Sequence, residues 1–147
     1  MSKMPTIILS ILLLGASSEP QAQGIESFKR YGDLKIFFNA FPSTFISPDI
    51  AKSKSIIRGE KNGLVNIAVT SQLGLHPKMK VSGIASNIFQ QRQKLIFKEI
   101  REGSAVYYLA TFEYDNEDFF TFNITVQSLS DAKGHGFKFQ KRMYIDS

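Results

Sequence analysis

The sequence contains no cysteine and no tryptophan, and its only histidines are His76 and His135. Without cysteine the chain can form no disulfide, carry no lipid on a cysteine, and use no thiolate in redox or zinc chemistry. Asp131 lies four residues before His135, but one histidine and one carboxylate are too few ligands for a catalytic zinc. We therefore expect no metal site and no cofactor, and a fold that its apolar core stabilises unaided.

Sequence motifs of known catalytic machineries are missing as well. The chain has no Gly-x-Ser-x-Gly nucleophile turn and no glycine-rich phosphate loop. A hydrolase would have to assemble its site in space from loop residues, and those available are His76, Asp131, His135 and Glu99. A small periplasmic hydrolase of this kind remains the alternative function, and the sequence assigns no catalytic residue.

The chain also has no apolar run long enough to span a membrane. The longest, residues 7–14, is well short of the roughly 20 residues that a spanning helix needs. It follows Lys3 and precedes small and polar residues, which is the layout of a secretory signal peptide. We predict a signal peptide over residues 1–22, cleaved after Ala22 or Ser18, and a single periplasmic domain over residues 23–147 that does not span the membrane.

Basic residues are in mild excess but form no block. The chain has 18 Lys and Arg against 13 Asp and Glu, for a net charge of +5, with no run of five like charges. A nucleic-acid-binding domain would need a contiguous basic face, preferably with stacking aromatic residues, so we expect no nucleic-acid partner. The scattered charges indicate a solvated surface, with attraction to anionic envelope components such as phosphate-bearing lipids or acidic glycans as the alternative.

What dominates the sequence is an alternation of apolar and polar residues with a period of two, which is typical of strands with one buried face. It recurs over residues 34–41, 65–70, 80–87, 95–100, 105–114, 119–126 and 137–145. We predict an all-β fold, an antiparallel β-sandwich of immunoglobulin-like architecture with seven or eight strands. A closed barrel alternates in the same way and remains open at this point.

Turn and capping signals separate these runs. Asn62-Gly63, residues 101–104 and residues 115–118 are predicted hairpin turns, and residues 130–136 form a longer loop. Gly83, inside a predicted strand, indicates a bulge or a close backbone approach. One short helix is predicted near Pro48, because Ser47 can cap it and Pro48 suits its first position.

The segment from Phe38 to Ile46 least resembles routine β structure, because aromatic residues recur around a proline that cannot donate a ladder hydrogen bond. One interpretation is a binding rim of aromatic and polar side chains, made of Asn39, Phe41, Ser43, Thr44 and Phe45. The other is a strand that crosses between sheets, with Phe41 and Phe45 closing the end of the core and Thr44 capping a turn.

These residues also carry a family resemblance. The landmarks, in order, are Tyr31-Gly32-Asp33, Asn39-Ala40-Phe41, Ser43-Thr44-Phe45, Gly63–Val69, Gly83-x-Ala85-x-Asn87, Phe97–Gly103 and Ala105-x-Tyr107-Tyr108 with Phe112. From about Phe28 to Ile145 the chain resembles a bacterial family known as domain of unknown function 4426. The resemblance implies a signal-bearing periplasmic protein of Gram-negative bacteria, and it brings no catalytic residue with it.

Together these observations favour a non-enzymatic binding or accessory module of the cell envelope. Its partner would be an envelope protein or an anionic envelope component. The candidate surfaces are the rim from Asn39 to Phe45 and an unpaired edge strand that accepts a strand from another chain. Lys138, Gln140 and Arg142 on the last strand would instead protect that edge from pairing.

Overall fold

The computed structural model describes residues 27–74, 77–103, 105–129 and 133–145 of the chain. The predicted signal peptide lies outside these residues, as do His76 and Asp131. The strands are β1 (Phe28–Tyr31), β2 (Leu34–Pro42), β3 (Asn62–Ser71), β4 (Met79–Asn87), β5 (Arg92–Ile96), β6 (Lys98–Glu102), β7 (Ala105–Glu113), β8 (Phe119–Ser128) and β9 (Gly134–Arg142). The helical elements are the 3-10 turn η2 (Ser43–Phe45) and the α-helix α2 (Pro48–Ser53).

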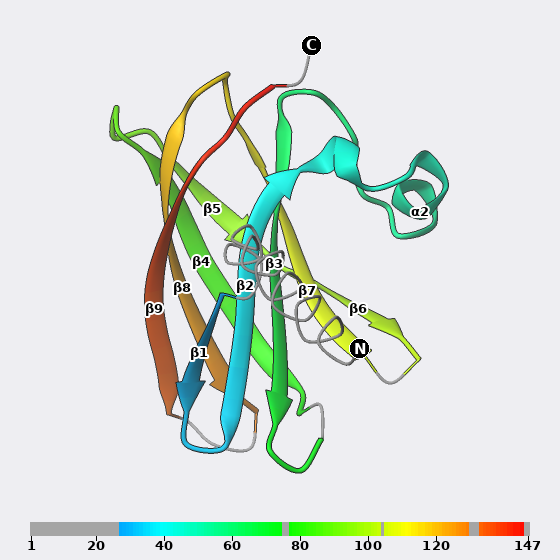
Figure 1. The fold of residues 1–147 in the computed structure, drawn as a ribbon, viewed down its shortest axis with the longest axis vertical. Coiled ribbons are helices and arrows are strands. Elements are labelled where there is room, and N and C mark those ends of the chain that lie inside the picture. Colours follow the sequence, from blue (N-terminus) through cyan, green and yellow to red (C-terminus); the bar gives the residue numbers. More distant parts are fainter. Residues whose placement is uncertain (1–26, 75–76, 104, 130–132, 146–147) are drawn as a thin grey trace, which may run out of the picture.

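The strands form two stacked sheets (Figure 1). One has five strands in the order β1-β2-β3-β7-β6, and the other has four in the order β5-β4-β8-β9. All neighbouring pairs are antiparallel. The fold is therefore the predicted antiparallel β-sandwich, and the division into two sheets decides against a closed barrel. None of the helices among the described residues has the length and apolar character to cross a membrane.

The described residues contain nine strands rather than seven or eight. The difference arises partly from β1 and partly from residues 95–100, which the alternation predicts as one strand. At Phe97 the chain leaves the four-stranded sheet at the end of β5 and enters the five-stranded sheet as β6. Leu95 is buried in the core, whereas Ile100 is buried on the outer face of the five-stranded sheet. The alternation of apolar and polar residues predicts which side chains are buried, but it does not predict whether they are buried between the two sheets or on an outer face.

Two of the predicted turns have a different role in the structure. Residues 115–118 connect β7 to β8, which lie in different sheets, so this connection is a crossover rather than a hairpin. Asn62-Gly63 lies inside β3. A Cβ atom on Gly63 would come within 2.6 Å of the Phe112 ring, so the glycine leaves room for that ring. The predicted hairpin at residues 101–104 joins β6 to β7, with Gly103 at a φ of 62°.

The core lies between the two sheets and is rich in aromatic residues. Phe112 of one sheet makes edge-on contacts with Phe120 and Phe122 of the other, each with ring centroids 5.1 Å apart. Phe122 stacks in turn on Phe139 at 4.9 Å. Such pairs contribute roughly 0.5–1.5 kcal/mol beyond the burial of their area. This packing accounts for a stable sandwich without disulfides.

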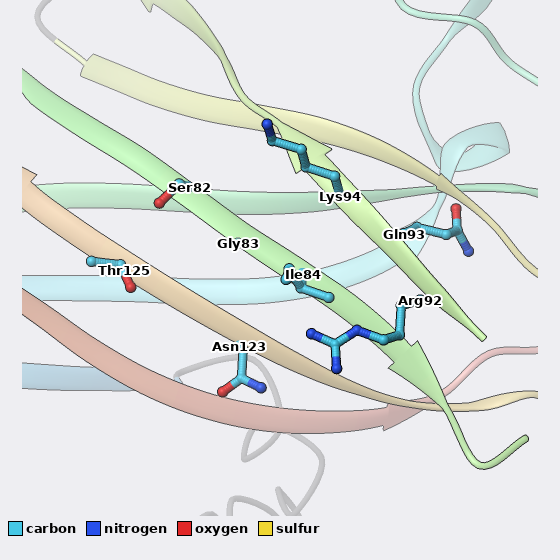
Figure 2. A pocket seen from close by; sticks show the side chains of 8 residues that line it. All are labelled: Ser82, Gly83, Ile84, Arg92, Gln93, Lys94, Asn123 and Thr125. Carbon is cyan, nitrogen blue, oxygen red and sulfur yellow. The ribbon is translucent and has the colours of Figure 1, made fainter. Parts of the chain in front are cut away.

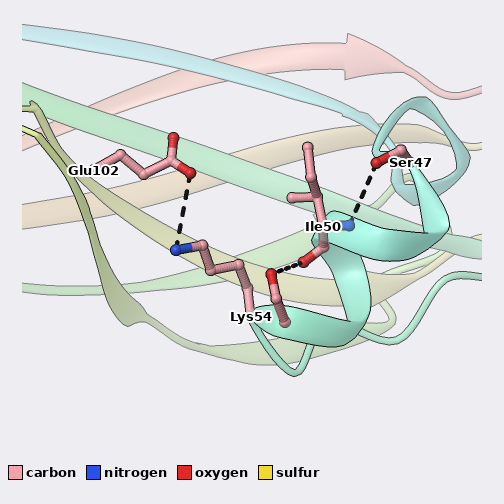
Figure 3. Close-up of polar contacts among 5 residues, drawn as sticks. Ser47, Ile50, Lys54 and Glu102 are labelled. Carbon is pink, nitrogen blue, oxygen red and sulfur yellow. Dashed lines mark hydrogen bonds and ion pairs between the residues drawn. The ribbon is translucent and has the colours of Figure 1, made fainter.

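The predicted short helix is present as α2. The Ser47 hydroxyl caps it by accepting a hydrogen bond from the Ile50 amide at 3.3 Å, and Pro48 occupies its first turn. Figure 3 shows this cap and the ion pair by which the end of the helix reaches β6. The helix belongs to a long connection, residues 43–61, that projects from one end of β2 (Figure 1).

Candidate functional site

Residues 43–61, which we call the cover segment, replace what would otherwise be a tight hairpin turn between β2 and β3. Pro42 and Gly63 are already register partners, so the chain could have turned there. Hairpin connections usually have two to five residues, whereas the cover segment is long enough to contain both η2 and α2, and binding residues are disproportionately found on such connections. This length is the first indication that the cover segment does more than connect strands.

Two side chains fix the shape of the cover segment. The Ser43 hydroxyl, which is fully buried, donates to the Gly59 carbonyl and accepts from the Gly59 amide, both at 3.0 Å. The Arg58 guanidinium donates to the Ile46 carbonyl at 2.7 Å and to the Thr44 carbonyl at 3.2 Å. These bonds join the two ends of the segment, so it closes as a loop of defined shape.

The middle of the cover segment is tied to β6. The Lys98 ammonium donates to the carbonyls of Lys54 and Ser55, at 3.3 and 3.4 Å. The Lys54 ammonium forms an ion pair with Glu102 at 3.8 Å (Figure 3). The Glu102 carboxylate is more than half exposed, so the ion pair contributes little to stability. Its effect is to place a charged pair beside the space that the segment covers.

Between the cover segment and the five-stranded sheet lies a cavity of about 250 Å³. Its wall is apolar and comes from both sides, and it includes Phe41, Ile46, Ile50, Ile56, Tyr107 and Leu109. Lys54 and Glu102 are also in the lining. A smaller hollow of about 120 Å³ adjoins it and shares Ile56, Ile100 and Leu109. An apolar space bordered by a few polar groups is the usual form of a binding site.

Two asparagines on the outer face of the sheet have buried carbonyl oxygens that find no hydrogen-bond partner among the described residues. Asn39 and Asn66 are register partners on β2 and β3, and Asn66 lines the cavity. The Oδ1 atoms of both are buried and unpaired. A buried acceptor without a partner costs roughly 1–3 kcal/mol, and such groups are rare enough to require an explanation. A bound group that carries an N–H or O–H donor would supply the missing partner.

The predicted rim residues are distributed around this site. Phe41 lines the cavity, and Asn39 lies beside Asn66. Ser43 is buried as an anchor of the cover segment, and the Thr44 carbonyl accepts from Arg58. Phe45 is 67% exposed and stacks on Phe41 with ring centroids 6.2 Å apart.

The alternative interpretation, in which Phe45 closes the end of the core, is therefore wrong. The chain does not cross to the other sheet after Pro42, because β3 returns to pair with β2. Sequence reasoning also missed Asn66 and the isoleucines of the cover segment. The available signal was an amide side chain at an outward position in the middle of the apolar strand β3.

The residues of the alternative hydrolase are not brought together where the structure describes them. His135 stacks on Tyr31, with ring centroids 4.5 Å apart, at the edge formed by β1 and β9. Glu99 lies on β6, the opposite edge of the five-stranded sheet, and pairs with Arg101. His76 and Asp131 lie outside the described residues. Across residues 27–74, 77–103, 105–129 and 133–145, no three His, Cys, Asp or Glu side chains gather as a metal site would require.

The fold and the site define a class: a two-sheet antiparallel β-sandwich with a covered cavity on the outer face of one sheet. Within that class, residues 28–146 match the model of the family described as Domain of unknown function (DUF4426). The chain belongs to this family, as the resemblance of its landmarks implies.

Solved structures agree with this assignment. A DUF4426 family protein from Pseudomonas aeruginosa PAO1 is 27% identical, with a TM-score of 0.76 over 84% of this chain and 98% of that one. FetP from uropathogenic Escherichia coli strain F11, expressed recombinantly in the periplasm, is 8% identical in sequence. Its TM-score is 0.63, and the match covers 84% of this chain and 96% of that one. A copper-bound variant of FetP is 8% identical in sequence and has a TM-score of 0.60, and the match covers 80% of this chain and 94% of that one. The FetP likeness shows a shared fold only. No curated protein matches the chain.

Proposed function

We propose that this protein is a non-enzymatic binding module of the bacterial cell envelope, and that the cavity beneath the cover segment is its binding site. The observation that carries the proposal is the pair of buried amide oxygens of Asn39 and Asn66, which have no partner in the part of the chain that the structure describes. The layout of residues 1–22 supports export, and export is tested by sequencing the N-terminus of the protein recovered from periplasm.

The size and lining of the cavity indicate what it binds. Small-molecule sites usually measure roughly 300–1,000 Å³, and this cavity, at about 250 Å³, is smaller. It suits one large side chain of a partner protein, inserted between Phe41, Tyr107 and the isoleucines of the cover segment. Tyrosine and tryptophan, which combine an apolar body with a hydrogen-bond donor, are the side chains that most often anchor protein interfaces.

The rim residues are the second part of the proposal. Phe45 presents most of its ring to solvent beside the cavity wall, where it would contact the partner around the inserted side chain. Such surrounding contacts exclude water from the anchor and contribute less energy themselves. Ser43 and Thr44 would act indirectly, through the shape of the cover segment.

The chemistry of the site can be tested with probes that differ by one donor. Indole carries an N–H group, and 1-methylindole has the same ring without it. We expect indole to shift the amide NMR signals of Asn66 and Tyr107 saturably, and 1-methylindole to bind about fivefold more weakly, because a paired acceptor contributes about 1 kcal/mol. Asn66→Leu should abolish the preference for indole.

The control for this experiment is Asn123→Leu, which changes an exposed asparagine on the other sheet and should leave both affinities unchanged. Equal binding of the two probes would show that the amide oxygens do not recognise a donor. Absence of saturable shifts with both probes would remove the cavity as a binding site.

A further inference from the structure

The four-stranded sheet carries basic residues but no acidic residue in any of its strands. Its six lysines and arginines are Lys80 on β4, Arg92 and Lys94 on β5, and Lys138, Lys141 and Arg142 on β9. The strands of the five-stranded sheet mix both signs, with Glu99, Glu102 and Glu113 among their basic residues. The acidic residues of the strands therefore lie on one sheet only, which the modest net charge of the chain does not reveal.

Most outward-pointing cations of this sheet stand on its two edge strands, with Arg92 and Lys94 on β5 and Lys138 and Arg142 on β9, while Lys80 points outward from the inner strand β4. Lys94 on β5 pairs with Ile84 on β4, which pairs with Asn123 on β8, which pairs with Lys138 on β9. This row crosses the whole sheet, and its charged ends are roughly 14 Å apart, because adjacent strands are separated by about 4.8 Å. Arg92 stands two residues before Lys94 on the same edge, about 7 Å along the strand.

Between these edges the surface is hollowed, and Gly83 and Ile84 line the hollow together with hydrogen-bonding groups. A cavity of about 510 Å³ opens over β4, β5 and β8, and Figure 2 shows the side chains around it. Ser82, Asn123 and Thr125 supply hydroxyl and amide groups, and Arg92 and Lys94 border it on β5. All five are exposed. The arrangement is a groove with hydrogen-bonding groups on its floor and cations at its margins.

Protection of the edge strands explains only part of this pattern. Charged side chains on β5 and β9 do hinder pairing with another chain, but either sign of charge serves that purpose. It explains neither the absence of acidic residues from all four strands nor the hollow between the edges, to which Ser82, Asn123 and Thr125 contribute hydrogen-bonding groups. Both features instead complement an elongated ligand that carries negative charge and many hydroxyl groups.

We propose that the outer face of the four-stranded sheet binds an anionic polysaccharide chain. The sugar hydroxyls would bond to Ser82, Asn123 and Thr125, and the acidic groups would face Arg92, Lys94 and Lys138. A nucleic acid fits less well, because Phe119, the outward aromatic of these strands, lies under the Arg142 guanidinium and offers no free stacking platform. A flat membrane surface does not match a hollow. This surface shares no residue with the cavity beneath the cover segment, so either proposal can fail alone.

The test uses polygalacturonate, a linear polysaccharide with a carboxylate on each sugar, and its methyl-esterified form, which has the same backbone without the charges. By isothermal titration calorimetry the mature protein should bind the first saturably and the second much more weakly. Affinity should fall as salt rises from about 50 to about 200 mM. Arg92→Gln with Lys94→Gln should weaken binding about tenfold, since two charged contacts are lost.

Two controls separate a site from general charge attraction. Lys29→Gln with Arg30→Gln removes the same charge from β1, an edge of the other sheet, and should change affinity less than about twofold. Asn123→Ala with Thr125→Ala changes no charge and should weaken binding while its salt dependence stays the same. Equal losses in the two charge variants, or binding to phosphatidylglycerol vesicles but not to polygalacturonate, would overturn the proposal. Thermal melts confirm that each variant is folded.

Discussion

At the scale of single residues, Gly83 shows how closely the strands of the smaller sheet approach each other. A Cβ atom at this position would lie 2.6 Å from the backbone carbonyl oxygen of Asn123 on β8. Backbone of a neighbouring strand cannot move aside as a flexible side chain can. The sequence already predicted a bulge or a close approach at this glycine, and the close approach is confirmed.

Gly83→Ala should therefore destabilise the fold by about 1–3 kcal/mol, the usual cost of forcing extra atoms into a packed site. Gly136→Ala on β9 is the matched control, because the nearest atom to its added Cβ would be 3.8 Å away. Urea unfolding of both variants measures the difference. Equal stability of the two would show that β4 and β8 are not packed as closely as described.

Tyr108 is a second residue whose environment has a measurable consequence. Burial raises the pKa of its hydroxyl, and the charge of Glu99 on the adjacent strand raises it further. Two effects lower this pKa: the Met79 amide donates a hydrogen bond to the Tyr108 oxygen at 2.9 Å, and the Arg101 guanidinium carries a positive charge. In the unfolded chain a tyrosine ionises near pH 10. Above that pH the unfolded state loses the proton before the folded state does, so the free energy of unfolding falls.

Tyr108→Phe should remove this part of the alkaline decline in stability. It should also lower the free energy of unfolding at neutral pH by about 1–3 kcal/mol, because the buried Met79 amide loses its acceptor. Urea titrations at about pH 9 and pH 11 measure both effects. Tyr144→Phe, which removes the hydroxyl of a tyrosine that is 56% exposed, is the control for the loss of stability at neutral pH and should leave that stability unchanged. The same alkaline decline in Tyr108→Phe and the parent would contradict this account.

At the scale of elements, the cover segment determines whether the cavity has a defined shape. Its fold depends on local contacts of Ser43 and Arg58 with backbone carbonyls and an amide. Little of it is buried, since Ile50 and Ile57 are 48% and 70% exposed. Segments of this kind open locally at a lower free energy than core strands.

Ser43→Ala should therefore loosen the cover segment while the sheets stay folded. It removes both hydrogen bonds to Gly59, and we expect hydrogen exchange to quicken at amides of residues 44–59 by about tenfold, equivalent to about 1.4 kcal/mol. Exchange in β4 and β8 should not change. Ser53→Ala, which removes one exposed bond to the Ile50 carbonyl, is the control. Faster exchange throughout the protein would show that Ser43 supports the whole fold instead.

The elements also show what a single sequence can and cannot predict. Alternation and the Ser47-Pro48 signal predicted most strands and the helix, because both depend on neighbours in the chain. The sheet change at Phe97 and the crossover at residues 115–118 depend on which strands pair, which alternation does not encode. For the same reason the sequence does not distinguish Asn66 from other outward-facing polar residues. Its significance comes from the cover segment lying over it.

At the scale of the whole molecule, the two outer faces of the sandwich differ in character. The five-stranded sheet carries an apolar area that the cover segment covers, and the four-stranded sheet carries a hollow with hydrogen-bonding groups that is bordered by cations. The sequence indicated export and scattered positive charge, but only the pairing of strands shows that one sheet has no acidic residue in its strands and that the paired asparagines lie on the other.

The central claim is that the fold retains unpaired amide oxygens in order to bind a donor. Replacing Asn39 and Asn66 together by leucine tests it most directly, with unfolding free energy and indole affinity measured on the same variant. Because two buried, unsatisfied acceptors are removed, we expect stability to stay equal or to rise while indole binding is lost. A loss of more than about 1 kcal/mol in stability would show that the two amides serve the free fold, and unchanged indole binding would show that they do not serve recognition.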